Sequence, residues 1–246
     1  MNPKILLPLF LLIALMTGAC SLNFNNFNIA VEQGSGKVIT QTRSVSNFDR
    51  VILNGIGDVV ITQGNTESLE IEAEDNVIPH IVTQVSNGAL VIDFDKNTTV
   101  PTKTIKFNLT MRNIHGLESK GVSNIQSDQI KTDHLDLAIS GTGNITLNNL
   151  TADRIDVSVS GAGNLTAQGQ VSTLTVNLSG AGNYNGQDLK TQTNTITISG
   201  LGRVVTWVTD SLDVTISGTG SVDYYGDPKI TQHISGVGNL RHLGSK

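Results

Sequence analysis

Two acidic positions twenty residues apart, Asp136 and Asp156, are the first residues whose types suggest chemistry. Each has a polar partner two places earlier, His134 and Arg154. Side chains two apart on a β-strand share one face, and neighbouring strands lie about 4.8 Å apart. On adjacent strands the four residues would form one patch, with the carboxylates about 5 Å apart. Such a pair beside a His or Arg could bind a cation or perform acid–base chemistry on a polysaccharide.

The simpler interpretation of this patch is a solvated face on which Arg154 offsets a pair of like charges. We favour it because nothing in the sequence indicates a cleft around the four residues. The remaining histidines lack the spacing of zinc ligands; they are His80, His115, His233 and His242. No metal site, cofactor or catalytic residue is therefore predicted.

A second candidate surface is aromatic and consists of Trp207, Tyr225 and the adjacent Tyr224. Trp207 and Tyr225 occupy equivalent places in two successive copies of a repeat, so they should stack on adjacent coils. Two outward rings could form a platform for a sugar ring or for a partner protein. The alternative is that they cover one side of the coil or shield its C-terminal end. Tyr184 falls in an inward position and is expected in the core.

The repeat that positions all these residues is a five-residue phrase, Ser-Gly-x-Gly-Asn, with some variation at its last place. Its first glycines stand at 141, 161, 180, 200, 218 and 236, which gives successive steps of 20, 19, 20, 18 and 18 along the chain. A degenerate copy begins at Lys120, one step of 20 upstream. Self-similarity at this period is typical of a solenoid.

Each phrase is preceded and followed by apolar residues at every second position, which predicts a strand on either side of a Gly-x-Gly corner. Glycine is expected there because it enters positive φ without a Cβ clash. One aliphatic column should run through the coils: Ile139, Val159, Leu178, Ile198, Ile216 and Ile234. The predicted fold is all-β, a single-stranded parallel β-helix (solenoid) with coils of about 18–22 residues. Its sense should be right-handed by the usual crossover preference.

Before the regular repeats, residues 38–61 contain another strand, a Gly55-Ile56-Gly57 corner and a second strand, which predicts a first coil. Asn87-Gly88 between apolar runs predicts a hairpin turn. The span from Gly55 to Gly121 is long enough for about three coils of roughly 22 residues each. We expect these longer coils to close the N-terminal end.

The N-terminus has the features of an export signal over residues 1–19, with Lys4 before an apolar core and small residues before Cys20. This ending resembles a bacterial lipobox, which implies cleavage before Cys20 and lipid attachment there; Ser21 resembles an outer-membrane sorting signal. The alternative is an ordinary secretory signal with a spare thiol. Residues 20–37 are Asn- and Gly-rich and predict a flexible tether, which leaves 38–246 as the folded domain.

The charge balance argues against two classes of partner. Without residues 1–19 the net charge is −6, because Lys4 is lost from a chain of net charge −5. No basic stripe with interleaved aromatics exists, so nucleic acid is not an expected partner. Attachment to a membrane would depend on Cys20, since an acidic domain is not attracted to anionic lipid.

Several motifs together resemble the auto-transporter adhesin head GIN domain family, a domain of unknown function common in bacterial envelope lipoproteins. They are the strand Phe48-Asp49-Arg50-Val51, the turn Gly55-Ile56-Gly57-Asp58, Glu72-Ala73-Glu74-Asp75-Asn76 before Ile78-Pro79, Asn87-Gly88-Ala89-Leu90, and the repeated phrase. The likeness covers about residues 38–238 and implies the β-helix and an adhesin-like role, with no catalytic residues.

We therefore expect a lipid-anchored, non-enzymatic binding or adhesion module of the bacterial cell envelope, on the outer membrane, with a glycan or surface-protein ligand. A periplasm-facing envelope scaffold and a polysaccharide-active enzyme are the alternatives. The last coil, ending near Arg241, His242 and Lys246, has no capping helix after it. Its open strand edge predicts docking on another molecule, including a second copy of this chain.

Overall fold

The computed structural model describes residues 33–95 and 100–246. The predicted signal peptide 1–19, Cys20 and residues 21–32 of the predicted tether lie outside the described residues. Within the described ranges the chain is nearly all strand, and its one helical element is the short 3-10 turn η1 (Ile78–His80). No helix in this part of the chain has both the length and the apolar character needed to cross a bilayer.

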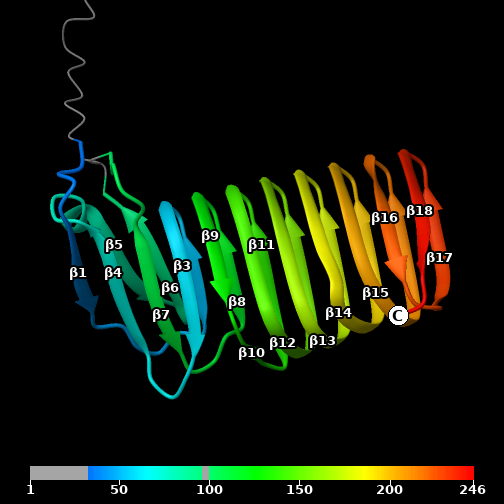
Figure 1. Ribbon diagram of the computed structural model, residues 1–246, viewed down its shortest axis with the longest axis horizontal. Helices are drawn as coiled ribbons and strands as arrows, with labels where there is room; N and C mark the ends of the chain where they lie inside the picture. Colours follow the sequence, from blue (N-terminus) through cyan, green and yellow to red (C-terminus); the bar gives the residue numbers. More distant parts are fainter. Residues whose placement is uncertain (1–32, 96–99) are drawn as a thin grey trace, which may run out of the picture. The chain divides into compact units, whose positions relative to one another are not determined.

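The strands form two faces, and within each face they lie side by side along one axis (Figure 1). Each coil runs from one face to the other. In stacking order, the first face contains β5 (Ile81–Ser86), β6 (Ala89–Phe94), β2 (Arg50–Leu53), β8 (Gly116–Ser119), β11 (His134–Ile139), the later parts of β12 (Thr142–Val159), β13 (Ala162–Leu178), β14 (Ala181–Ile198) and β15 (Leu201–Ile216), and β17 (Lys229–Ile234). The second contains β1 (Val38–Arg43), β4 (Ser68–Glu74), β7 (Lys106–Met111), β3 (Ile56–Gln63), β9 (Val122–Ser127), the earlier parts of β12–β15, β16 (Thr219–Tyr225) and β18 (Val237–Gly244). The short β10 (Ile130–Lys131) pairs with the middle of β12.

The repeat sets the pairing register, and neighbouring coils are parallel. Equivalent corner residues pair in one continuous row: Thr142, Ala162, Ala181, Leu201, Thr219 and Val237. The steps between these partners equal the steps between the repeated glycines in the sequence. The predicted all-β parallel solenoid is therefore confirmed, whereas its right-handed sense stays a prediction.

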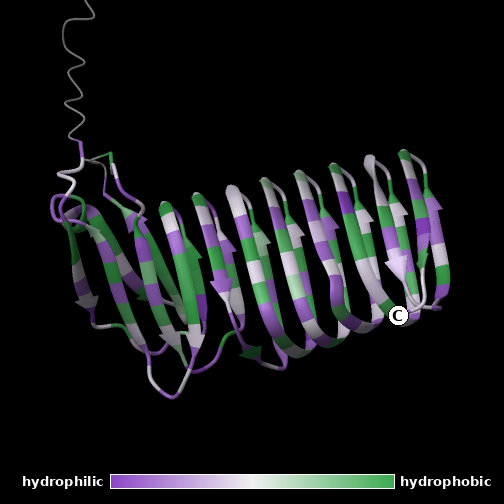
Figure 2. Ribbon diagram, viewed as in Figure 1, coloured by the Kyte–Doolittle hydropathy of each residue, from purple (hydrophilic) through white to green (hydrophobic). Residues whose placement is uncertain are grey.

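The core consists of aliphatic columns, because apolar and polar residues alternate along the regular strands (Figure 2) and the apolar ones are buried. The column predicted from the sequence is in register, and its members from Ile139 to Ile216 are at most 1% exposed. A second column on the other face contains Tyr184, which is 1% exposed, so its predicted core position is confirmed. One coil alone cannot cover its own interior, so the stack is the stable unit.

The glycines at the corners are needed for a reason other than the expected one. Among the Ser-Gly-x-Gly glycines only Gly143 has a positive φ, at 158°, which is close to extended backbone. Instead, the first glycine of each phrase lies against the coil before it. A Cβ on Gly161 would be 2.0 Å from the carbonyl oxygen of Gly141 and 2.4 Å from that of Ser140. The corners therefore require glycine because the backbones of successive coils approach too closely for a side chain.

The N-terminal region differs from the predicted series of three longer coils. Strands β2 and β3 pair in parallel directly with β8 and β9, for example Arg50 with Gly116 and Ile56 with Val122. Residues 64–115 therefore form an insertion between two stacked coils. Its strands β6 and β7 continue the parallel stack beyond β2 and β3, and β5, β4 and β1 follow in antiparallel pairing. The region does close the N-terminal end, and Asn87 and Gly88 form the expected hairpin turn with φ of 50° and 76°.

Residues 33–37, predicted as part of the tether, are held against this N-terminal end. The side chain of Glu74 is 1% exposed and accepts hydrogen bonds from Gly36 N (2.6 Å) and from Thr102 N (2.7 Å) and Oγ1 (2.5 Å). The hydroxyl of Thr102 is the main reason that the pKa of Glu74 is lowered. Ser35 N donates to Asn76 Oδ1 at 2.8 Å. The folded part of the chain therefore begins before Val38.

A buried carboxylate joins three coils near the C-terminal end. Asp223 is 2% exposed and accepts hydrogen bonds from Arg203 Nε (2.6 Å) on the preceding coil and Arg241 Nε (2.8 Å) on the following one. Burial alone would raise the pKa of Asp223, but the hydrogen bonds from Arg241 and Arg203 outweigh it and the pKa is lowered. Arg203, which stands where other copies of the phrase have Asn, makes one of these contacts.

The last coil ends in exposed strands, as the sequence indicated. All six residues of β17 are exposed, among them Ile230 (42%) and Ile234 (37%), which continue core columns of the preceding coil. On β18, Val237 is 74% exposed. Docking of a second molecule at this edge stays a prediction.

Candidate functional site

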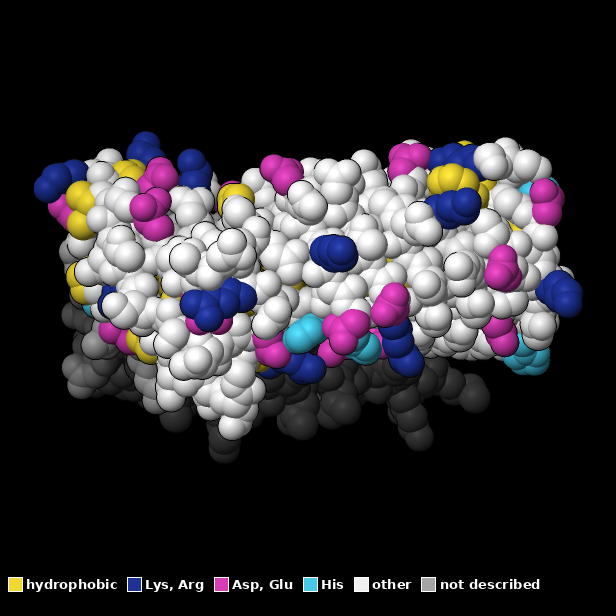
Figure 3. All heavy atoms as spheres, turned by 90° about the horizontal axis from the view of Figure 1, so that it is seen from below, with side chains coloured by type: hydrophobic (Ala, Val, Ile, Leu, Met, Phe, Trp, Pro, Cys, Tyr) yellow, Lys and Arg dark blue, Asp and Glu magenta, His cyan; other side chains and the backbone are white. Residues whose placement is uncertain are grey.

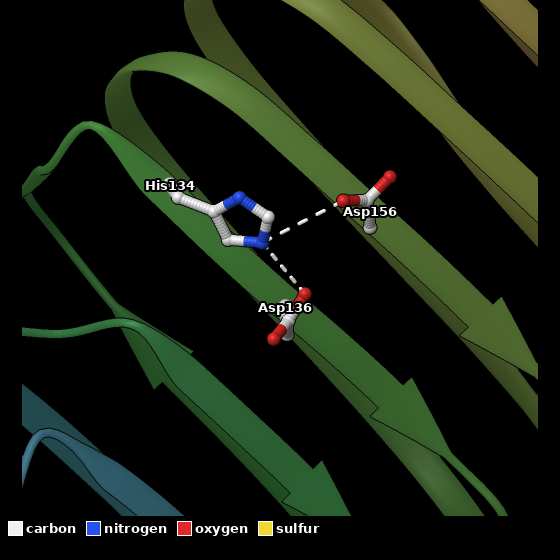
Figure 4. Close-up of side chains that lie close together, drawn as sticks. All are labelled: His134, Asp136 and Asp156. Atoms are coloured by element: carbon white, nitrogen blue, oxygen red, sulfur yellow. Dashed lines mark hydrogen bonds and ion pairs between the residues drawn. The ribbon is translucent and has the colours of Figure 1, made fainter.

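The patch predicted from His134, Asp136, Arg154 and Asp156 is assembled as expected. Strands β11 and β12 pair His134 with Arg154 and Asp136 with Asp156. The ring of His134 points between the two carboxylates (Figure 4). Its Nε2 lies 2.8 Å from Asp136 Oδ1 and 3.5 Å from Asp156 Oδ2. We call His134, Asp136 and Asp156 the His–Asp cluster.

Two arginines neutralise the carboxylates of the His–Asp cluster. Arg154 donates to both oxygens of Asp156, at 2.7 and 2.9 Å, and Arg50 lies 3.3 Å from Asp136 Oδ2. The hydrogen bond from Arg154 lowers the pKa of Asp156, against the opposing effect of burial. A general acid at neutral pH needs a raised carboxyl pKa. Asp156 is therefore not suited to the acid step of polysaccharide cleavage.

A second charged cluster, which the sequence did not reveal, borders the first. His115 Nδ1 lies 3.0 Å from Asp49 Oδ2, and its Nε2 lies 3.2 Å from Asp133 Oδ1. Together with Arg50, His134 and Asp136 these residues line an open hollow of about 440 Å³. Figure 3 shows His, acidic and basic side chains side by side near the middle of this face, with further charged side chains toward both of its ends.

The charged partners of His115 predict a pH-dependent contribution to stability. The hydrogen bond to Asp49 raises the pKa of His115 above its ordinary 6.5, against the effect of burial, and Asp133 adds to the rise. The stabilisation is therefore fully present below pH 6.5 and is lost as the pH rises through the raised pKa. Its size should stay below about 1 kcal/mol, because the ring is one third exposed to solvent.

Urea unfolding of the wild type and of His115→Gln at pH 5.5 and pH 8.5 measures this effect. The variant should be less stable than the wild type at pH 5.5, and the gap should narrow at pH 8.5. An equal gap at both values would contradict a role for the protonated ring, since the other histidines titrate in both proteins.

The three aromatic residues of the predicted platform lie only partly as the sequence indicated. Trp207 and Tyr225 pair directly on β15 and β16 and are both half-buried. The Nζ of Lys246 lies 5.2 Å from the Trp207 ring centre and 5.0 Å from that of Tyr225, so this ammonium covers both rings. Tyr224 is 8% exposed and stacks on His242 with ring centres 4.8 Å apart. Trp207 and Tyr225 therefore lie on adjacent coils as predicted, whereas Tyr224 is buried, and ligand binding at this surface stays a prediction.

A groove along the glycine corners was also not predicted from the sequence. Two adjoining hollows of about 560 and 530 Å³ share Thr142, Gly143 and Asn144 and extend along the second face. Beside them runs a ladder of side-chain amides in which each donates Nδ2–H to the Oδ1 of the residue before it: Asn124, Asn144, Asn164 and Asn183, at 2.9, 3.0 and 2.8 Å. Asp58 accepts from the first amide at 2.8 Å. We call this surface the corner groove.

The sequence of residues 47–228 matches the family model described as putative auto-transporter adhesin, head GIN domain. The chain belongs to this family. The head GIN domain here covers the first coil, the insertion and nearly all of the regular coils. No curated protein matches the chain.

Solved structures agree with this membership. The chain is similar to a putative adhesin from Bacteroides fragilis, with 27% identity, 86% of this chain and 99% of that chain covered, and a TM-score of 0.80. A putative lipid binding protein from Parabacteroides distasonis shares the fold at 19% identity, with 86% and 98% covered and a TM-score of 0.69. The family description and the adhesin-named neighbour are consistent with an adhesion-like module of the bacterial envelope or surface and suggest a non-enzymatic role.

Proposed function

We propose that this head GIN domain is an envelope adhesion module, held to the outer membrane by lipid on Cys20, and that it binds an extended neutral glycan in the corner groove. The single observation that carries the proposal is the amide ladder, which repeats at the spacing of the coils along an open, continuous surface. The adhesin description of the family supports the general role.

The ladder retains hydrogen-bonding capacity after its own bonds are made. A side-chain amide has two N–H donors and an oxygen with two lone pairs. Asn144 and Asn164 each use one donor and one lone pair within the ladder. One N–H and one lone pair therefore remain on each for the hydroxyls of a ligand.

The rest of the groove fits a neutral sugar chain better than a protein. None of the residues lining the hollow that extends from Thr142 to Gly202 is charged, and the adjoining hollow has one charged residue of each sign, Asp58 and Lys103. Beside the ladder, the exposed corner row contributes Val122 and Leu201, each 59% exposed, with smaller residues between them. A sugar ring offers C–H groups to such a row and hydroxyls to the amides. A protein partner would instead need large aromatic or Arg anchors in a deep pocket.

Binding to immobilised neutral polysaccharides and to a glycan array tests the proposal. The double variant Asn144→Ala/Asn164→Ala should lose about tenfold or more in affinity, because four amide hydrogen-bonding groups are removed at the centre of the groove. Asn177→Ala is the matched control, since Asn177 is an exposed amide on the first face of β13 and should bind as the wild type does.

Two outcomes would overturn the glycan proposal. One is binding that survives the double variant unchanged. The other is the absence of any bound glycan together with a protein partner whose capture depends on Asn144 and Asn164, which would assign the groove to protein recognition.

A further inference from the structure

We propose that the His–Asp cluster is a binding site for a divalent first-row transition ion such as Zn²⁺ or Mn²⁺, with His134 Nε2, Asp136 Oδ1 and Asp156 Oδ2 as the protein ligands. The proposal departs from the expectation of no metal and is independent of the glycan groove, which lies on the other face. Among the described residues, these three form the group of His and acidic side chains whose ligand atoms converge on one point.

The separations of the three atoms suit a common ion. All lie within 4.8 Å of one another, and two of the separations, 2.8 and 3.5 Å, are given by the contacts of His134. Ligand atoms bound at about 2.0–2.2 Å from one ion lie roughly 3–4 Å apart. The ring nitrogen already faces both carboxylates, so small side-chain rotations are enough to bring the three atoms around one ion (Figure 4).

The backbone register explains why the site exists at this place and not elsewhere on the column. Parallel pairing holds Asp136 and Asp156 side by side, and like charges directly opposite are unfavourable on a sheet. At the equivalent place the later coils have Thr175, Thr195, Asp213 and Thr231, so two adjacent carboxylates occur only between β11 and β12 on this column. A cation between them would add to the compensation that Arg50 and Arg154 already give.

The mixed donor set defines the class of ion. Calcium takes six to eight oxygen ligands and magnesium keeps most of its waters, whereas imidazole favours zinc and its neighbours in the first transition row. The site is partly exposed, since His134 and Asp136 are 40% and 43% exposed. The remaining coordination positions are therefore open to water or to an atom of a partner molecule.

The two arginines affect the site in different ways. Arg50 contacts Asp136 through Oδ2 and leaves Oδ1 free to bind the ion. Arg154 contacts both oxygens of Asp156 and so competes with an ion directly. Its side chain is 55% exposed, so the guanidinium can turn into solvent when the ion binds, at the cost of its two hydrogen bonds to Asp156.

Calorimetric titration of the chelator-treated full chain with ZnCl₂ and then MnCl₂ tests the site. We expect one ion per chain and an increase in the melting temperature on binding. Asp136→Asn and His134→Gln should each weaken binding by at least about tenfold, because each removes one of three ligands. Arg154→Gln should tighten it by about two- to fivefold, because it removes the competing cation.

Asp213→Asn is the matched control, since Asp213 lies at the equivalent place on β15 without a second carboxylate beside it. It should bind the ion as the wild type does. The proposal is overturned if the wild type binds neither ion at millimolar concentration, if His134→Gln binds as tightly as the wild type, or if Asp213→Asn weakens binding as much as Asp136→Asn. Circular dichroism of each variant confirms that all are folded.

Discussion

Replacing Gly161 by Ala should destabilise the domain by about 3 kcal/mol or more. The added Cβ would lie 2.0 Å from the carbonyl oxygen of Gly141. Neither atom can move away freely, because the stack fixes the backbones that carry them. The clash can be relieved only if the two coils separate. Separation breaks the hydrogen bonds from Gly161 N to Ile139 O (3.1 Å) and from Ala162 N to Gly141 O (2.9 Å). Urea unfolding of the variant and the wild type measures the loss.

Two further variants at this corner identify the cause. If glycine were needed for a left-handed backbone, Gly161→Asn would be tolerated better than Gly161→Ala. Because close approach is the cause, Asn should be at least as damaging as Ala. Ala162→Ser changes an exposed side chain one position away and should leave stability within about 0.5 kcal/mol of the wild type. A stable Gly161→Asn would refute the close-approach explanation.

The second large effect is expected in the core, where Ile198→Asp should unfold the regular coils. Ile198 is fully buried between Leu178 and Ile216 in neighbouring coils. The substitution removes an aliphatic side chain worth roughly 1.5–3 kcal/mol and leaves a buried carboxylate without a partner, which costs several kcal/mol more. Such a loss is comparable to the whole stability of a typical domain.

Far-ultraviolet circular dichroism and size-exclusion chromatography at room temperature should show loss of the strand signal or aggregation for Ile198→Asp. Thr193→Asp is the control, because Thr193 is exposed on the same strand β14. It introduces the same charge and should remain folded. A cooperative melting transition of Ile198→Asp near that of the wild type would mean that the column is not essential.

The regular coils could be predicted because their signals repeat. The Ser-Gly phrase fixes the register, and the register alone places His134, Asp136, Arg154 and Asp156 in one patch. Local signals also sufficed for the hairpin at Asn87-Gly88. What failed was the assumption that segments stack in the order of the sequence, which holds from β11 onward but not before it.

Because of that assumption, the cluster of Asp49, His115 and Asp133 was not predicted. His115 contacts both Asp49 and Asp133 because the coil of β2 and β3 lies directly against β8 and β9, across the insertion of residues 64–115. The likeness of Gly55-Ile56-Gly57-Asp58 to the phrase at Gly121 was the available signal for this neighbourhood. The contact of Lys246 with Trp207 and Tyr225 had no such signal, because a single flexible side chain makes it.

The same insertion affects the order in which the chain can fold. From β11 onward each coil pairs with the one that directly precedes it in the sequence, so the stack can grow by one coil at a time during synthesis. Strands β2 and β3, in contrast, pair on both sides with strands that come later in the chain. Arg50, for example, pairs with Gly116 on one side and with Ala89 on the other. Closing so long a loop is entropically costly and slow. The first coil to be synthesised therefore acquires its native partners only after the chain has been made as far as Ser127.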